Sequence, residues 1–438
     1  MNRPTQLTLA LTLILGTTSL YATNGSNLIA TGAEARAMGG TGIGISHGAE
    51  SGLANVALIT SVTATEVSFG GMFFMPDVSN TNSMNLGQLG DETGEGTSAS
   101  DLNVIPEVSI AGKINDNFYM GIGIWGTAGM GVDYRGSKNT GQMEMVTNLQ
   151  LMQFALPLAY KNDNFSVGIT PVLQYGSLDI NYNMSQNIQQ AMAAGGMMAQ
   201  GVTDQTIIDA EMAKVTSSKN VGAGMAQDLK FGYNLGLAYQ VADFTIGATY
   251  KSQIDMFYKG VLTSAIGAMG VTTYKNDILS TPAEIGIGVS YVYAQNSFAF
   301  DIKQINWEDA KGYQDFNWEN QTVYALGYEY KMKGMAFRLG YNYANSPISE
   351  SKTTNSENLT AGLVNTFNTL GFPGIIESHY TVGGCFRINE QMSLATAIVY
   401  APESEISYDN FLSSEQMAQT STTIHSQTSV SFDLVYRF

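Results

Sequence analysis

The sequence predicts an all-β protein: a 14-stranded antiparallel transmembrane β-barrel with an N-terminal hatch, or plug, inside its lumen. Charged residues make up only 13% of the 438 residues, about half the share usual in soluble proteins. No window approaches the roughly 18 to 20 consecutive apolar residues of a membrane-spanning helix. Segments of about ten residues with period-two alternation recur instead, as in strands that cross a bilayer. Short and long connections alternate between these segments.

Residues 1–22 have the pattern of a secretory signal peptide. Arg3 and the amino terminus are positive, an apolar run follows around Leu7 to Leu15, and small residues lead to Ala22. Such a run is too short to span a membrane. We therefore expect an exported protein that is cleaved after Ala22.

Residues 23–61 do not alternate like strands. They are rich in Gly and Ala and contain few large apolar side chains. They could form a disordered periplasmic tail, but a compact plug is favoured because small residues allow the backbone to pack closely. A barrel of about fourteen strands also encloses a space that must be filled or left as a channel. The side chains expected to anchor the plug are Leu28, Ile29, Leu53, Val56, Leu58 and Ile59.

The barrel is predicted over residues 62–438. Phe231, Tyr233 and Leu235 share one face of a segment whose other face carries Gly232 and Asn234, and side chains of a strand point alternately to opposite faces. Aromatic residues near the strand ends favour membrane interfaces over a soluble core. The predicted strands are 62–75, 101–113, 117–127, 147–160, 164–182, 227–240, 243–259, 280–294, 296–306, 320–332, 335–346, 376–388, 391–402 and 426–438.

The connections set the orientation of the barrel. Outer-membrane barrels have short turns on the periplasmic side and long loops outside, so both barrel ends are expected in the periplasm. The last strand, 426–438, should pair with 62–75, because an open sheet edge leaves backbone groups unsatisfied in lipid. Its aromatic end resembles the signal read by the barrel-assembly machinery, which is an expected partner.

The longest predicted loop, 183–226, has partly helical spacing of apolar residues around Met192 and Met197. Methionine is flexible and suits surfaces that accept varied apolar shapes. This segment could be a helical cap packed over the barrel rim, or an outer capture site for an apolar ligand. The two interpretations are compatible.

Several charged residues fall on the predicted lumen face. A charge that faces lipid at mid-depth costs roughly 2–4 kcal/mol, so an inward orientation is favoured. These charges could simply pair with one another and hold barrel and hatch together. Alternatively they could meet the carboxylate headgroup of a ligand, for which Arg338, Lys303 and Lys251 are the candidates. Arg36 of the hatch is expected to tie the hatch to the wall.

Other classes of site find little support. A net charge of −17 argues against a nucleic-acid partner, and Cys385, the only cysteine, allows neither an intrachain disulfide nor a cysteine-built zinc site. Three scattered histidines make no metal cluster. Gly44-Ile45-Ser46-His47-Gly48 matches the serine-hydrolase elbow, but the motif requires a strand before it and a helix after it. We expect no metal, no cofactor and no enzymatic activity.

The sequence also resembles a family. "GAEARAMGGTGIG" followed by "ANVALIT" is similar to the hatch of the FadL/TodX outer-membrane transporters of hydrophobic compounds, as are "FRLGYNYANSPIS", residues 379–406 and the YRF ending to their later strands. The family usually has Asn-Pro-Ala where this chain has Asn55-Val56-Ala57, followed by Leu58, so a fixed backbone angle is lost. The expected hatch and gating residues are Arg36, Asn55, Val56, Ala57 and Leu58.

The resemblance implies a monomeric barrel that takes up ligand passively. Ligand is captured at the outer loops, binds in an apolar lumen site, and leaves sideways into the bilayer when the hatch shifts. The gap for this exit is made by an inward kink in the third strand, which Gly121, Gly123, Gly126 and Gly129 would permit. Lipid and lipopolysaccharide of the bacterial outer membrane would surround the barrel.

Three functions remain open from the sequence. The favoured one is uptake of long-chain fatty acids or similar amphiphiles. The second is uptake of aromatic or alkane hydrocarbons by the same mechanism. The third belongs to another class, a structural barrel or adhesin that transports nothing.

Overall fold

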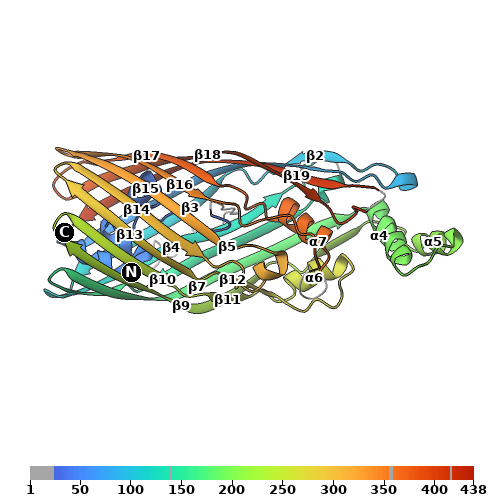
Figure 1. Ribbon diagram of the computed structural model, residues 1–438, viewed down its shortest axis with the longest axis horizontal. Coiled ribbons are helices and arrows are strands. Elements are labelled where there is room, and N and C mark those ends of the chain that lie inside the picture. The colour runs from blue at the N-terminus through green and yellow to red at the C-terminus, as the bar shows by residue number, and fades with distance from the viewer. Residues whose placement is uncertain (1–23, 138–139, 355–358, 415–416) are drawn as a thin grey trace, which may run out of the picture.

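The computed structural model describes residues 24–137, 140–354, 359–414 and 417–438, so the predicted signal peptide lies outside the described residues. The described strands form a closed antiparallel barrel of fourteen crossings (Figure 1), as predicted. The crossings are β1 (Glu66–Asn82), β3 (Asn103–Lys113), β4 (Phe118–Asp133), β5 with β6 (Val146–Ala155 and Leu158–Asn162), β7 (Phe165–Met184), β9 (Ala226–Val241), β10 (Phe244–Lys251), β13 (Glu284–Tyr293), β14 (Asn296–Ile305), β15 (Gln321–Met332), β16 (Met335–Ala344), β17 (Ser378–Arg387), β18 (Met392–Asp409) and β19 (Thr420–Arg437).

The last strand closes the barrel on the first, as expected. β19 pairs with β1 over its whole length, from Glu66 opposite Arg437 to Asn82 opposite Ser421. Closure leaves no sheet edge in the lipid region, where water cannot satisfy free backbone groups. An ion pair between Arg437 Nε and Glu66 Oε2 (2.8 Å) fixes the periplasmic end of this seam.

The predicted apolar face is the outer face of the barrel. Phe231, Leu235 and Leu237 are exposed on β9, whereas Asn234 between them is buried. The same alternation appears on β13, where Ile285 and Ile287 are exposed and Glu284 is buried. The apolar side chains therefore face lipid and the polar side chains face the lumen, because successive side chains of a strand point to opposite faces.

Several strands differ in length from their predicted bounds: β4 ends at Asp133 rather than 127, β10 at Lys251 rather than 259, and β18 at Asp409 rather than 402. β1 begins at Glu66 rather than 62, because a 3-10 helix ends at Ser61 and residues 62–65 connect it to the strand. β1 and β19 also extend farther outward than predicted, because Pro76 to Asn82 continue the ladder with Ser421 to Gln427 beyond the barrel rim. β5 and β6 are interrupted at Pro157, which lacks the backbone N–H for a regular ladder.

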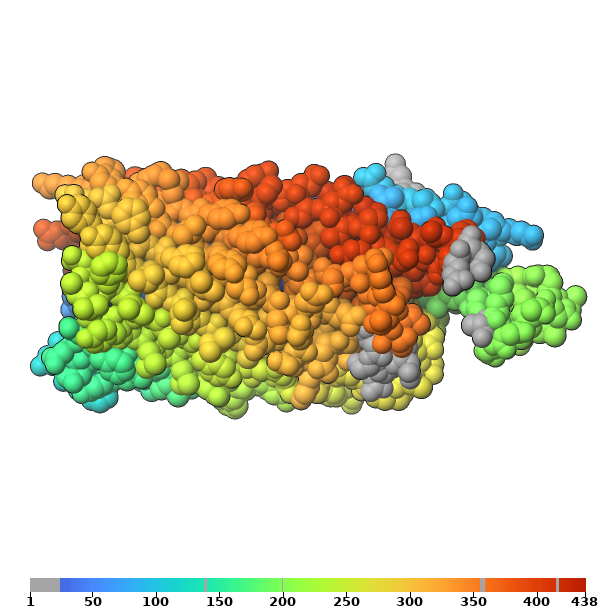
Figure 2. All heavy atoms as spheres, viewed as in Figure 1, coloured from blue at the N-terminus to red at the C-terminus, as the bar shows by residue number. Residues whose placement is uncertain are grey.

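The long loops gather at one end of the barrel and carry the remaining elements. These are η3 (Gly87–Leu89), β2 (Gly94–Thr97), η4 (Thr140–Gln142), α4 (Gln186–Ala199), α5 (Gln205–Met212), β8 (Lys219–Gly222), β11 (Ile254–Phe257), α6 (Val261–Ala268), β12 (Ile278–Thr281), η5 (Tyr313–Phe316), α7 (Ala361–Thr366) and η7 (Phe367–Gly371). Helices α4 and α5 project beyond the rim as a separate green lobe (Figure 2). None of the described helices is long and apolar enough to cross a membrane.

The hatch lies inside the barrel, toward the end with the short turns. Its elements are α2 (Ala33–Ala37), η1 (Gly48–Glu50), α3 (Ser51–Ala54) and η2 (Val56–Ser61). Its glycines touch opposite walls: a Cβ on Gly39 would lie 2.6 Å from backbone atoms of Leu326 and Tyr341, and one on Gly52 would lie 2.9 Å from Pro157. Small residues thus allow the hatch backbone to pack directly against the strands.

Candidate ligand-binding site

A buried cluster of charges fastens the start of α2 to the wall. Arg36, only 1% exposed, forms an ion pair with Glu107 of β3. The same carboxylate accepts a hydrogen bond from Gly32 N (2.9 Å), and Asp433 of β19 accepts one from Ala33 N. Arg36 therefore lies between hatch and wall, in the position expected of a residue that ties the two together.

A second anchor fastens the middle of the hatch to β14. Asp301 accepts hydrogen bonds from three successive backbone amides, Gly42 N (2.7 Å), Ile43 N (2.8 Å) and Gly44 N (3.4 Å). Hydrogen bonds to an ionised acceptor are stronger than those between neutral groups. This anchor and the first one hold residues 32–44 in place.

Asn55 fixes the backbone before Val56. Its Nδ2 donates to Ile43 O (2.8 Å) and to Leu237 O (2.9 Å), and its Oδ1 accepts from Ala57 N (3.1 Å). The backbone of Asn55 is extended, with φ −150° and ψ 105°, which is the conformation that a following proline would favour. The Asn55 side chain thus holds the geometry although Val56 replaces the proline. Val56 is buried, and Ala57 and Leu58 pack against Ala238 of β9.

The third crossing, β4, carries a bulge. Gly126 lies opposite Met152 and Ala128 lies opposite Leu151, so Thr127 is an extra residue. The ladder between β3 and β4 ends at Glu107 opposite Trp125. Beyond that point the hatch takes the place of β3, because Leu28 N donates to Thr127 O (3.1 Å) and Gly129 N donates to Ser26 O (3.0 Å). The wall between β3 and β4 is therefore unpaired next to the hatch.

Apolar side chains fill this interruption in the wall. Met72 and Phe74 of β1, Ile105 of β3 and Leu28 of the hatch form one buried cluster. Gly126 leaves the space for Ile105, since a Cβ there would lie 2.6 Å from the Ile105 side chain. We name these four residues the gap cluster. One of its members, Leu28, belongs to the hatch rather than to the wall.

A small cavity of about 80 Å³ lies between the hatch and the barrel wall, and we name it the polar cavity after the charged and amide groups in its otherwise largely apolar lining. Asn234, Lys251 and Glu284 stand opposite one another on β9, β10 and β13 and line it. Lys303 of β14 lines it as well. Glu284 Oε2 lies 3.2 Å from Lys251 Nζ and 3.6 Å from Lys303 Nζ. The structure thus brings two of the three predicted headgroup residues, Lys251 and Lys303, together.

The cavity adjoins the large apolar core of the outer half of the barrel. Leu53 and Val323 line the cavity and also belong to that core. The core is formed mainly by loops that fold inward. They include Trp307, Tyr313 and Trp318, whose rings pack edge-to-face or tilted with centroids 4.6–4.9 Å apart. An apolar region and a site with two ammonium groups and two carboxylates therefore meet next to the hatch.

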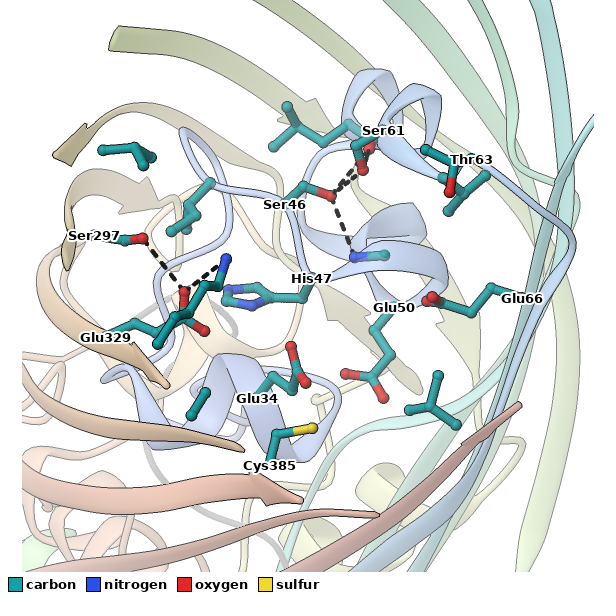
Figure 3. Close-up of a pocket in the computed structure, with 18 of the residues that line it drawn as sticks. Glu34, Ser46, His47, Glu50, Ser61, Thr63, Glu66, Ser297, Glu329 and Cys385 are labelled. Atoms are coloured by element: carbon teal, nitrogen blue, oxygen red, sulfur yellow. Dashed lines mark hydrogen bonds and ion pairs between the residues drawn. The ribbon is translucent and has the colours of Figure 1, made fainter. Parts of the chain in front are cut away.

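The third predicted residue, Arg338, lies elsewhere. It lines a separate cavity of about 660 Å³ beneath the hatch (Figure 3). Its Nη2 pairs with Glu329 Oε2 (2.6 Å) on the neighbouring strand and with Glu34 Oε2 (2.9 Å) of α2. Burial raises the pKa of Glu34, but Arg338, His47, Cys385 and Arg437 together outweigh it and hold this pKa below its usual value. Arg338 thus binds the hatch and is not brought together with the two lysines.

The serine-hydrolase motif has no catalytic surroundings. Ser46 Oγ lies 2.6 Å from Ser61 Oγ (Figure 3). It also contacts Ser51 Oγ (3.1 Å) and Leu58 O (3.1 Å). The His47 ring bonds to Thr41 O (2.8 Å) instead, and burial lowers the pKa of His47. Both side chains fix turns of the hatch. Within the described part of the chain, no group of three His, Cys, Asp or Glu side chains could hold a metal ion.

The two candidate methionines of the outer loop lie on α4. Met192 is half-buried against the large apolar core, and Met197 is half-buried farther along the helix. Ser185 caps this helix by accepting from Ile188 N (3.1 Å) and also donates to Glu92. Both residues are remote from the polar cavity, since neither lines it.

The site contains two amides that were not among the predicted binding residues. Asn27 of the hatch donates from Nδ2 to Glu284 Oε1 (3.0 Å). Asn234 lines the cavity with a buried Nδ2 that has no hydrogen-bond partner among the described residues. Strand alternation does place Asn234 on the lumen face. Nothing in the sequence near Asn27 indicates its partner, because that contact depends on how the hatch folds.

Comparisons with known proteins agree with this architecture. The family described as outer membrane protein transport protein (OMPP1/FadL/TodX) matches residues 21–357. A long-chain fatty acid transport protein of Escherichia coli O6:H1 is 26% identical over 359 residues, covering 72% of this chain and 77% of that protein. Outer membrane protein P1 of Haemophilus influenzae is 23% identical over 380 residues, covering 75% and 80%.

Solved structures share the fold. A Pseudomonas aeruginosa FadL homologue superposes with a TM-score of 0.70 at 15% identity, covering 94% of this chain and 100% of that one. The toluene transporter TodX of P. putida gives 0.65 at 17% identity, covering 94% and 99%. The chain therefore belongs to the OMPP1/FadL/TodX family of outer-membrane proteins, which are transport channels for hydrophobic compounds and not enzymes.

Proposed function

We propose that this channel takes up long-chain fatty acids, or amphiphiles of the same kind, by passive diffusion across the outer membrane. The observation that carries the proposal is the junction of an apolar core with a lysine-lined cavity at Leu53 and Val323. A molecule with a long apolar chain and an anionic headgroup can bind the apolar core with its chain and the lysines with its headgroup. A hydrocarbon can bind only the apolar core.

The apolar chain supplies most of the binding free energy. Each buried methylene contributes about 0.8 kcal/mol, so a chain of about sixteen carbons gains on the order of 10 kcal/mol. The polar cavity, at about 80 Å³, has room for a headgroup but not for such a chain. The chain must therefore enter between the apolar side chains of the loops that fill the outer half.

The headgroup requires a charged partner once it leaves water. An uncompensated buried charge is strongly unfavourable. The side chains of Lys251 and Lys303 are 21% and 16% exposed and line the cavity. We assign the headgroup to these two lysines, with the Nδ2 of Asn234 as an additional donor. Arg338 is assigned to hatch attachment, because it already binds Glu34 and Glu329.

In this proposal the ligand leaves through the barrel wall into the bilayer, and not through the cavity beneath the hatch. The cavity beneath the hatch is lined by charged groups, including Glu34, Glu329, Arg338 and Arg437, which an apolar chain would not enter. The gap cluster, in contrast, is apolar and leads from the lumen to the wall between β3 and β4. Movement of Leu28 would open it. In this mechanism α4, with Met192 and Met197, captures the ligand at the outer surface.

Uptake measurements with paired ligands test this proposal. In the Lys251→Gln/Lys303→Gln variant, uptake of radiolabelled hexadecanoate into proteoliposomes should fall by about tenfold or more, as expected for the loss of hydrogen bonds to charged groups. Uptake of toluene should not change. The control is Lys214→Gln/Lys275→Gln, since these two lysines are exposed on the outer loops.

Other outcomes select the alternatives. Uptake of toluene by both proteins, with no uptake of hexadecanoate by either, would favour the hydrocarbon channel named for several structural relatives. Uptake of neither ligand would favour a barrel that transports nothing. A monomeric state in lipopolysaccharide-containing membrane, and assembly through the β19 end by the barrel-assembly machinery, are further parts of the proposal.

A further inference from the structure

Glu284 occupies the position where a ligand carboxylate would bind. Its Oε2 lies between the ammonium groups of Lys251 (3.2 Å) and Lys303 (3.6 Å). Both distances exceed the 2.7–2.9 Å typical of a strong charge-assisted hydrogen bond. The carboxylate is therefore shared between two cations and held tightly by neither, so a second carboxylate could take its place.

The arrangement of the two acids favours exchange at Glu284. Asp301 also lines the cavity, but its oxygens accept hydrogen bonds from the amides of residues 42–44, which hold it in place. An incoming carboxylate would therefore compete with Glu284, and not with Asp301, for the two ammonium groups.

Glu284 is also bound to the hatch. Its other oxygen, Oε1, accepts a hydrogen bond from Asn27 Nδ2 (3.0 Å). Asn27 belongs to residues 24–31, which we name the hatch arm. The arm is also joined to β4 by the two backbone hydrogen bonds of Ser26 and Leu28 and to the loops by Ser26 Oγ and Tyr313 Oη (3.2 Å).

The arm is fastened differently from the rest of the hatch. From residue 32 onward the hatch is fixed by the carboxylates of Glu107, Asp433 and Asp301. The two parts meet at Gly32, whose φ of 84° lies in the left-handed region that favours glycine. The arm and the body of the hatch are thus held by separate sets of contacts, so the contacts of the arm could be released while the body stays anchored.

We infer that Glu284 is a built-in substitute for the ligand headgroup, and that a ligand carboxylate which displaces it also releases the hatch arm through Asn27. Asn27 is followed directly by Leu28, the hatch member of the gap cluster. Binding of an anionic head at the lysines is thus coupled to opening of the wall at Leu28. A neutral ligand of equal length binds the core but leaves the arm in place. This inference rests on the proposed function.

Hydrogen exchange followed by mass spectrometry on the full chain in detergent tests the coupling. Hexadecanoate should accelerate amide exchange in residues 24–31 by about tenfold, the effect of losing a hydrogen bond to a charged group. Methyl hexadecanoate, which has the same chain without the charge, should leave that exchange unchanged. In Asn27→Ala the arm should exchange rapidly without any ligand, and hexadecanoate should not accelerate this exchange further.

Asp301→Asn serves as the matched control, because it loosens residues 42–44 but should preserve the effect of hexadecanoate on the arm. Hexadecanoate that binds to the wild type without changing exchange in residues 24–31 would overturn this inference alone. Equal acceleration by the methyl ester would do the same. Absence of any hexadecanoate binding would overturn the proposed function together with it.

Discussion

Arg36 is the most deeply buried cation among the described residues, and its pairing with Glu107 determines how the hatch is held. Arg36→Met should loosen the hatch by about 3–5 kcal/mol, because it leaves Glu107 buried without its partner. Hydrogen exchange in residues 32–40 measures the change. Arg135→Met is the control: Arg135 pairs with Asp133 at an exposed position, where an ion pair contributes at most about 1 kcal/mol. Equal effects of the two substitutions would contradict the anchoring role.

Glu50 makes the hatch sensitive to pH. Burial, together with the negative charges of Asp433 and Glu34, raises the pKa of Glu50 well above its usual value. A carboxyl group with a raised pKa stabilises the fold in its protonated form, so this contribution is lost as the pH rises through the raised pKa. Glu50→Gln should therefore increase the melting temperature relative to wild type at pH 8, and this advantage should shrink toward pH 4. An advantage that is constant across this range would contradict the account.

Period-two alternation predicts which charges face the lumen, but it does not give their height along the barrel axis. Arg338 lies four residues from Gly334 in a periplasmic turn, whereas Lys303 lies eight residues from Gln295 in the turn before its strand. The hatch separates these two levels. From the sequence, Arg338 could be grouped with Lys303 and Lys251 because all three side chains are expected to face the lumen. Only the fold shows that Arg338 lines a different cavity.

At the scale of elements, the bulge in β4 is the feature that opens the wall. Deleting Thr127 should restore a regular ladder with β5, because Gly126 and Ala128 already face consecutive residues, Met152 and Leu151. We expect a folded barrel whose hexadecanoate affinity is retained and whose uptake falls by about tenfold or more, in the range of effects that a closed conformational gate has on rate. Uptake assays in proteoliposomes check this, and unchanged uptake would rule out exit between β3 and β4.

Helix α4 tests the capture step separately from transport. Met192→Ser/Met197→Ser should raise the ligand concentration needed for half-maximal uptake by roughly tenfold, since each substitution removes most of the apolar side-chain surface that the ligand would bury. The maximal rate should not change, because neither residue lines the polar cavity. The control is Met225→Ser, which alters a methionine that is 54% exposed outside the two helices. If the double variant takes up dilute ligand as wild type does, α4 is only a cap.

The strands could be predicted from the sequence because each crossing shows its alternation locally. The loops could not. Phe316 and Phe367 pack together in the outer half with ring centroids 5.6 Å apart, yet they lie in short helical turns of two different loops, which are too short to show a period in the sequence. Their burial depends on contacts between distant loops. The apolar core that supports the proposed ligand site was therefore invisible in the sequence, although the lysines beside it were not.

At the scale of the whole molecule, the hatch divides the lumen into two chemically different chambers. Below it lies a polar cavity of about 660 Å³, and above it lies the apolar core with the lysine-lined pocket at its base. Closure of β19 on β1 and the sorting of short and long connections follow from the sequence alone. The division into chambers does not, because it requires the hatch to be placed among strands far away in the chain.

The most direct test of the account compares the equilibrium affinities of hexadecanoate and methyl hexadecanoate, measured by calorimetry in detergent, in wild type and in Lys251→Gln/Lys303→Gln. The account predicts that wild type prefers the acid by roughly tenfold to a hundredfold, the range expected from hydrogen bonds to charged groups. In the double variant this preference should disappear while binding of the ester is kept. Equal affinities for both ligands in wild type, or a preference that survives in the double variant, would contradict a headgroup site at these two lysines.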